Sequence, residues 1–189
     1  GDTITAVPYT LDGGSAPEIV ESDDTTHGKK ILHLKGGYLS IPNPMKGGLA
    51  DVTGFSVTMW VKMPTADLTS ALVSMIGTSN DSIYFTGNDC LKYEGSGYLE
   101  VNNPNYVKTG DLTDSEWHSV GFSITTSGFQ IFLDGILKYD INNNLSLNSG
   151  VTRASGFDYS NVAATVTSAP YIYIGVGGPT QLNEAYYGD

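Results

Sequence analysis

The sequence predicts an all-β protein built as a sandwich of antiparallel sheets, and three observations support this fold class. Short runs rich in Val, Ile, Phe and Tyr alternate with clusters of Gly, Pro, Asn and Asp, as is typical of strands joined by turns. Ser, Thr and Asn are together more common than charged residues, which make up 15% of the chain. No window repeats apolar residues at i, i+3, i+4 and i+7, so we expect helix of a turn or two at most, near residues 64–72.

We expect one domain over residues 1–189, because all-β sandwiches of this length are commonly single domains. No linker in the sequence divides the chain. The segment 142–170 is long, polar and weakly patterned, and a loop of that length in a compact domain is usually functional or mobile. Gly1 takes the place of an initiator Met, as in a processed or trimmed chain, so a missing leader does not argue against export.

Nine runs are predicted to be strands, and the first stands in a polar, turn-rich N-terminal segment. Each later run is bounded by Gly, Pro, Asn or Asp clusters, as expected for antiparallel strands in a meander or Greek key. The eighth run contains Asp134-Gly135 between alternating residues, which favours a tight hairpin turn because Gly tolerates positive φ. In chain order the runs are 4–11, 30–43, 54–63, 71–78, 82–87, 97–103, 117–125, 128–140 and 171–177.

Alternation within these runs separates a core face from an outer face, because successive side chains of a strand point to opposite faces of the sheet. The residues on the predicted core face are aliphatic or Phe, and they would fill the space between two sheets. His118 shares this face with Val120. The expected core residues are Phe55, Val57, Met59, Val61, Val120, Phe122, Ile124, Phe129, Ile131, Leu133, Ile172, Ile174 and Val176.

The opposite face of the same strands carries aromatic residues, most of them with a polar group, mixed with Ser, Thr and Lys. Such rings suit half-exposed positions and ligand surfaces, because they combine apolar area with a hydrogen-bonding group. The pattern is also typical of cross-strand aromatic pairs that stiffen a solvated sheet, worth about 0.2–1 kcal/mol per pair. On the first interpretation the ligand-binding residues are Trp60, Tyr84, Tyr98, Tyr171 and Tyr173, and Phe132 shares their face.

The charge balance limits the partners. With 20 acidic and 9 basic residues, the net charge of −11 would repel a phosphate backbone or an anionic membrane, so we expect no nucleic-acid partner. The acidity is compatible with a divalent cation or a neutral ligand such as a glycan, and it is also a common device for solubility. No apolar run approaches the roughly 20 residues of a membrane span. The single cysteine, Cys90, excludes an intrachain disulfide and is expected to be a small buried apolar residue.

Motifs for catalysis are missing from the sequence. The three histidines form no metal-binding spacing such as H-E-x-x-H, and no G-x-S-x-G elbow or phosphate-binding loop appears. Glycoside hydrolysis needs two carboxylates, and none of the six glutamates recurs at even spacing within one strand. Glu100 alone shares a strand face with Tyr98 and Asn102. We therefore expect no enzyme, and we keep a glycoside hydrolase with an unrecognised site as an alternative.

Three segments resemble the laminin-G-like branch of the concanavalin A-like lectin/glucanase superfamily, in particular domains of bacterial surface proteins. They are LKGGYLSIPN followed by GFSVTMWVKM, then EWHSVGFSIT with GFQIFLDGILK, and finally YIYIGVGG. The resemblance covers roughly residues 29–189 and implies a jelly-roll sandwich of two antiparallel sheets. It also implies that the Trp-His pair is structural, which makes His118 a core residue. The family's closing strand, beginning Gly-x-Ile-Asp-Asp, is not found after residue 184.

The resemblance also implies a function. Glucanases of the family carry a close Glu/Asp motif on one strand that is absent here, while other members bind glycans or proteins, often with calcium held by loop carboxylates. Asp81 and Asp158 are the residues that would hold calcium. We therefore expect a non-catalytic recognition module of an exported surface or periplasmic protein, which stacks sugars on the aromatic residues named above. The alternative is a structural or protein-adhesion domain of a larger surface assembly.

Overall fold

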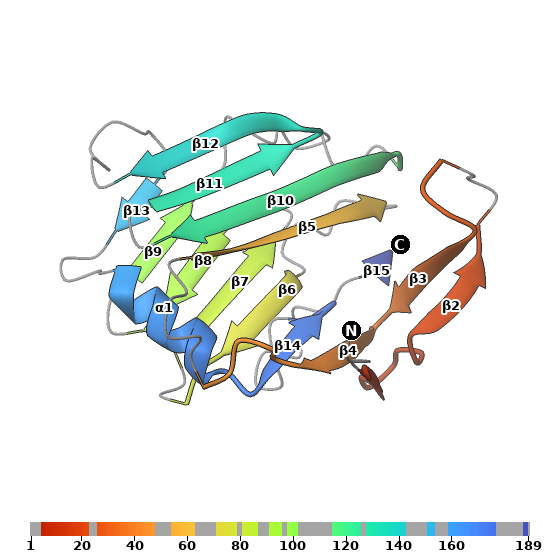
Figure 1. Ribbon diagram of the computed structural model, residues 1–189. Helices are drawn as coiled ribbons and strands as arrows, with labels where there is room; N and C mark the ends of the chain where they lie inside the picture. The colour runs from red at the N-terminus through yellow and green to blue at the C-terminus, as the bar shows by residue number, and fades with distance from the viewer. Residues whose placement is uncertain are drawn as a thin grey trace.

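The computed structural model describes residues 5–22, 26–47, 54–62, 71–78, 81–86, 91–95, 98–101, 115–125, 128–142, 151–153, 159–176 and 187–188. These residues form three antiparallel sheets and one helix (Figure 1). The prediction of an all-β jelly-roll sandwich is confirmed, and a small additional sheet accompanies the two large ones. Among the described residues, no helix is long and apolar enough to cross a membrane.

The largest sheet has eight strands, and every pairing within it is antiparallel. Three of its strands, β8, β9 and β13, are short and lie together at one edge. Its order is β1 (Val7–Thr10), β4 (Gly37–Pro42), β14 (Tyr171–Ile174), β6 (Ala71–Ile76), β7 (Ser82–Thr86), β8 (Leu91–Glu94), β9 (Tyr98–Val101) and β13 (Val151–Arg153).

A four-stranded sheet packs over this one, and a three-stranded sheet lies beside the pair (Figure 1). The four-stranded order is β12 (Ile136–Asn142), β11 (Gly128–Leu133), β10 (Trp117–Thr125) and β5 (Gly54–Lys62). The three-stranded order is β15 (Tyr187–Gly188), β3 (Lys30–Lys35) and β2 (Glu18–Glu21). Strands β2, β8, β13 and β15 were not predicted, because runs of two to four residues are too short to show an apolar alternation.

The core lies between the two large sheets, as the alternation predicts. Phe122 of β10 stacks on Phe85 of β7, with ring centroids 5.2 Å apart, and meets Phe55 of β5 edge-on at 5.9 Å. Of the expected core residues, Val61, Val120, Phe122, Ile124, Ile131, Leu133 and Val176 are buried, and Phe55, Val57, Met59, Ile172 and Ile174 are partly buried. The side chain of Phe129 lies outside what the structure describes.

The hairpin between β11 and β12 turns at Asp134-Gly135, as predicted. Both residues have positive φ, 51° and 74°, which is the geometry of a two-residue type I′ turn. The Asp134 carboxylate accepts a hydrogen bond from the backbone N–H of Ser119 and lies 2.9 Å from Nδ1 of His118. The side chain of His118 is 14% exposed and lies in an ion-pair geometry with the turn.

The expectation of no helix beyond a turn or two is wrong, because α1 spans Tyr159–Ser168 within the segment predicted as a loop. The helix lies at one end of the sandwich beside β6 and β7 (Figure 1). Val162, Thr165 and Val166 of the helix are buried, as is Ala169 directly after it, and these four do follow the i, i+3, i+4, i+7 spacing. Thr165 and the β-branched valines hid the pattern, since these residues are weak helix formers.

The C-terminal end of α1 is capped by a side chain from a distant strand end. Asn43, just after β4, donates from Nδ2 to the backbone carbonyls of Val166 and Ala169 at 2.7 and 2.8 Å. Its Oδ1 accepts from the backbone N–H of Met45 at 3.0 Å. The last backbone carbonyls of a helix have no partners within the helix. The buried Asn43 amide donates to two carbonyls at this end, and it thereby joins the helix to the eight-stranded sheet.

We predict that Asn43→Ala lowers the free energy of unfolding by about 1–3 kcal/mol, because buried carbonyls lose their donor. Ile19→Ala is the control, since Ile19 is 65% exposed and should change stability by no more than about 0.5 kcal/mol. Urea denaturation followed by circular dichroism measures both. Equal stability of the two variants would contradict the role of Asn43.

Candidate functional site

Four tyrosines form a continuous aromatic surface on the eight-stranded sheet, which we call the tyrosine surface. Tyr9 stacks on Tyr38 with ring centroids 4.9 Å apart and planes 10° from parallel. Tyr38 meets Tyr173 edge-on at 6.1 Å, and Tyr173 lies 6.2 Å from Tyr171. Tyr9 and Tyr171 are 45% and 43% exposed, so the two ends of the surface are open to a ligand.

Strand register places these rings on one face. Tyr9 of β1 lies opposite Tyr38 of β4, while Tyr173 of β14 lies opposite Ser40, the next position of β4 on the same face. Ile172 and Ile174 alternate with the β14 tyrosines and pack against the core. The tyrosine surface is therefore the outer face of the sheet, because side chains of one strand alternate between faces.

The predicted residues Tyr84 and Tyr98 belong to the same sheet. In the cross-strand pairing, Tyr173 lies opposite Ser74, and Ser74 lies opposite Tyr84. Tyr98 of β9 lies opposite Glu94 of β8. The backbone thus places Tyr84 in the cross-strand row of Tyr173, and Tyr98 on a strand further along the sheet. The structure does not describe these two side chains.

Packing changes the acidity of two phenols in the tyrosine surface. Burial raises the pKa of Tyr38, and the neighbouring Tyr9 adds to the effect. Burial also raises the pKa of Tyr173, with smaller contributions from the other three tyrosines. Both hydroxyls stay protonated across the physiological range, so they can both donate and accept hydrogen bonds.

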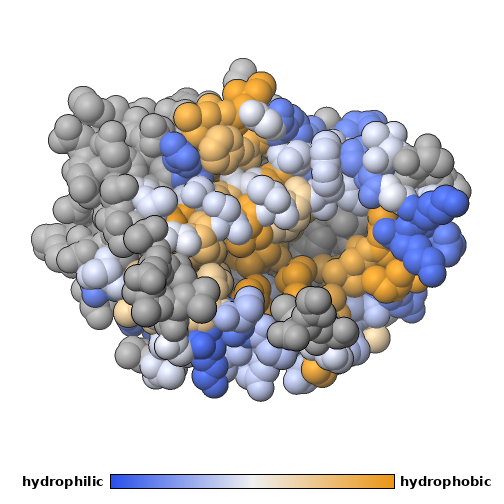
Figure 2. All heavy atoms as spheres, in the orientation of Figure 1, coloured by the Kyte–Doolittle hydropathy of each residue, from blue (hydrophilic) through white to orange (hydrophobic). Residues whose placement is uncertain are grey.

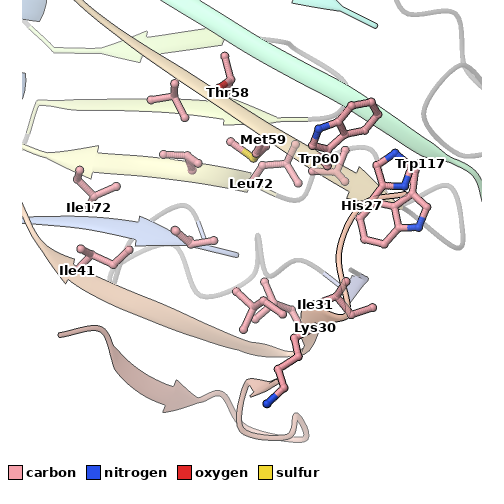
Figure 3. A pocket seen from close by; sticks show the side chains of 16 residues that line it. His27, Lys30, Ile31, Ile41, Thr58, Met59, Trp60, Leu72, Trp117 and Ile172 are labelled. Carbon is pink, nitrogen blue, oxygen red and sulfur yellow. The ribbon is translucent and has the colours of Figure 1, made fainter. Parts of the chain in front are cut away.

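Trp60 does not join the tyrosines, although the alternation places it on an outer face. It lies on β5 of the four-stranded sheet, is 53% exposed, and forms a cluster with His27 and Trp117. The His27 ring lies 4.3 Å from the Trp60 ring and 5.2 Å from the Trp117 ring, measured between centroids (Figure 3). The predicted aromatic residues thus divide between two surfaces.

This second cluster lies at the mouth of a groove of about 490 Å³ between β5 and the opposite strands. Aliphatic side chains from all three sheets line the groove, among them Met59, Ile172 and Ile31 (Figure 3). Figure 2 shows apolar surface running through a hollow at this place. The groove therefore exposes part of the sandwich interior, whereas the tyrosine surface lies on its exterior.

The predicted calcium site is not tested, because the structure describes only one of its two ligands. Asp81 precedes β7, is partly buried, and its backbone carbonyl accepts a hydrogen bond from the Gly77 N–H at 2.8 Å. Asp158 lies outside the described residues. Within the described part of the chain, no group of three or more His, Cys, Asp or Glu side chains is placed to hold a metal ion. Calcium binding stays a prediction.

Four residues of these two surfaces were not predicted as site residues. Tyr38 had a usable signal, since it alternates with Leu39 and Ile41 of the same strand and so belongs to the outer face. Tyr9 comes from a run without clear alternation. His27 lies in a turn, where periodicity gives no information, and the family resemblance implied a structural role for Trp117. Only the fold brings these residues to their neighbours.

Comparisons with known proteins agree on the fold. The family model of the concanavalin A-like lectin/glucanases superfamily matches residues 34–174, well over half of the chain. A search of curated proteins finds no significant match. Domain 4 of a GH43 extracellular arabinanase from Geobacillus stearothermophilus, in complex with arabinotriose, has a TM-score of 0.61 at 17% identity, covering 98% of this chain and 77% of that chain.

Two further structures resemble the chain more distantly. Domains LG4-5 of the mouse laminin alpha1 chain have a TM-score of 0.46 at 16% identity, covering 73% of this chain and 31% of that chain. The binding domain of botulinum neurotoxin DC, in complex with rat synaptotagmin II, has a TM-score of 0.46 at 12% identity, covering 90% and 38%. The arabinanase likeness, at 17% identity, shows the fold alone, and these two weaker likenesses carry no argument.

We predict that the Tyr38 and Tyr173 hydroxyls lose their protons above pH ~10, the ordinary value for tyrosine, since both pKa values are raised. A raised pKa means that the protonated phenol is favoured in the folded state. The stability that the folded protein gains from this preference is therefore fully present at pH values below the tyrosine pKa of the unfolded chain. It is lost as pH rises through the tyrosine pKa of the folded protein. Ultraviolet difference absorbance measures the titration, with the protein unfolded in denaturant as control.

In this titration, Tyr38→Phe and Tyr173→Phe should each remove a late-titrating group from the folded curve. Circular dichroism at each pH separates this effect from alkaline unfolding. Folded and unfolded curves with the same midpoint would contradict the desolvation of these rings.

Proposed function

The chain belongs to the concanavalin A-like lectin/glucanases superfamily, and on that basis we propose that it is a non-catalytic module that binds a neutral oligosaccharide on its tyrosine surface. The observation that carries the proposal is the continuous set of four stacked and edge-on rings on one outer sheet face. Calcium is not required by the proposal.

Sugar rings have apolar C–H faces and polar edges, and an exposed tyrosine matches both. Its ring offers apolar area for stacking, while its hydroxyl reaches the edge of the sugar. Tyr9 and Tyr171, the exposed ends of the surface, would stack on separate sugar units. Tyr38 is only 8% exposed, so it would hold Tyr9 in place rather than contact the ligand.

Two further observations support an oligosaccharide ligand. The arabinanase domain that covers nearly the whole chain was solved with arabinotriose, so a chain of sugar units can bind to a protein of this fold. The net charge of −11 favours a neutral glycan over one that carries sialic or uronic acids. Laminin-G-like domains are typically extracellular, and we therefore propose an exported, surface-bound or periplasmic location.

The alternative of a hydrolase has one positional feature to test. Glu94 of β8 lies opposite Tyr98, and Glu100 of β9 lies opposite Lys92, so the two glutamates occupy diagonal positions on neighbouring strands. Diagonal neighbours have Cα atoms about 7–8 Å apart. Glycosidases use pairs of carboxylates whose carboxyl groups, rather than Cα atoms, lie about 5–10 Å apart. Any glycan that binds should therefore also be incubated with the protein and checked for released reducing ends.

We predict that a neutral oligosaccharide from a plant and host glycan panel raises the melting temperature, because a ligand that binds the native state stabilises it. Tyr171→Ala should lower its affinity about tenfold, equivalent to ~1.4 kcal/mol, through loss of a stacking ring. Isothermal titration calorimetry measures the affinity. The proposal also requires that no reducing ends are released.

Trp60→Ala is the matched control, because Trp60 is 53% exposed against 43% for Tyr171 but lies on the four-stranded sheet. It should leave glycan affinity unchanged. If Trp60→Ala abolishes binding while Tyr171→Ala does not, the glycan site is the groove mouth. If no glycan in the panel binds, the module is a structural or protein-adhesion domain.

A further inference from the structure

Within the described part of the chain, one edge of strand β5 is unpaired. The strand pairs with β10 along all nine of its residues, from Gly54 opposite Thr125 to Lys62 opposite Trp117. It stands last in the order of its sheet, and among the described residues no strand pairs with its other side. In an antiparallel strand every second residue directs its N–H and C=O to each side, so this edge presents a row of backbone groups.

The groove runs along this open edge. Val57 and Met59 point toward the core but are only partly buried, unlike Val120 and Phe122 of the neighbouring strand. Residues of β3 and β14 form the facing wall, including Ile31 and Ile172 (Figure 3). A segment laid along β5 would cover these apolar side chains and pair with the backbone at the same time.

We propose that this groove binds an extended polypeptide segment, which adds as a strand to the open edge of β5. Its alternate side chains would be apolar and would enter the groove beside Met59 and Ile31. The side chains between them would face outward, next to Thr58 and Trp60. Strand addition of this kind takes affinity from main-chain hydrogen bonds and specificity from pockets for alternate side chains.

The chemistry of the groove favours a peptide over a glycan or an acyl chain. Its interior is aliphatic, so the hydroxyls of a sugar would find few partners there. An acyl chain would fill the interior but leave the backbone groups of β5 without hydrogen bonds. An extended peptide satisfies both requirements.

Charge gives the segment a preferred composition. Although acids outnumber bases in the chain by 20 to 9, the described residues that line the groove include no Asp or Glu, and those that can carry charge are His27 and Lys30. Lys30 also faces the exposed Glu21 at 3.8 Å. We therefore expect a segment with an acidic residue at the end near Lys30, while the backbone edge supplies most of the affinity.

The test uses a nine-residue peptide, the length of β5, with Val at alternate positions, Ser and Thr between them, and one terminal Glu. The only two tryptophans of the chain, Trp60 and Trp117, both line the groove, so intrinsic fluorescence reports its occupancy. We expect saturable binding at or below about 1 mM peptide. Two further peptides are N-methylated at one or the other alternate set of residues, which removes N–H donors and keeps the side chains.

At least one N-methylated peptide should lose binding by at least about tenfold, because one alternate set of N–H groups faces β5. If both bind as well as the parent peptide, the groove is a non-specific apolar site and strand addition is wrong. If the parent peptide does not bind at all, the proposal is overturned.

Variants locate the site independently of the peptide chemistry. Met59→Lys should abolish binding, and Ile31→Lys on the facing wall should do the same if Met59→Lys fails to fold. Tyr171→Ala should bind the peptide like the unmodified protein, because it alters only the tyrosine surface. Loss of peptide binding in Tyr171→Ala would place the peptide on the wrong face and overturn the proposal.

Discussion

The stacking of Phe122 on Phe85 joins the two large sheets, and both candidate surfaces depend on the packing around it. Once the aliphatic residues of each strand are buried in this core, alternation fixes which residues face outward. On β14 the burial of Ile172 and Ile174 turns Tyr171 and Tyr173 to the exterior. The tyrosine surface is thus a consequence of the core rather than a separate feature.

Much of this arrangement could be predicted from the sequence, because apolar residues at every second position indicate both that a run is a strand and which of its side chains face the core. The outward placement of Tyr171 and Tyr173 follows in this way. The stacking of Tyr9 on Tyr38 could not be predicted, since it depends on the pairing of β1 with β4. Sequence alternation also cannot tell which sheet a strand joins, and so Trp60 was grouped with tyrosines that lie on another sheet.

Helix α1 was missed for a different reason. Its buried residues keep helical spacing, but Thr165 and two valines have low helix propensity, and the preceding segment is polar. Packing against the core and the cap from Asn43 stabilise the helix where local propensity does not. Tertiary contacts therefore decide this element, as they decide the position of His27 against the two tryptophans.

The two surfaces suit different ligands because their chemistry differs. The tyrosine surface offers rings with neutral hydroxyls, whereas the groove offers aliphatic walls and the backbone edge of β5. The most direct test of glycan binding is nuclear magnetic resonance of protein labelled at tyrosine rings and tryptophan indoles, titrated with the best glycan of the panel. The account predicts shifts of the Tyr9, Tyr171 and Tyr173 rings with the Trp60 indole unchanged. A shifted Trp60 indole with unmoved tyrosine rings would contradict it.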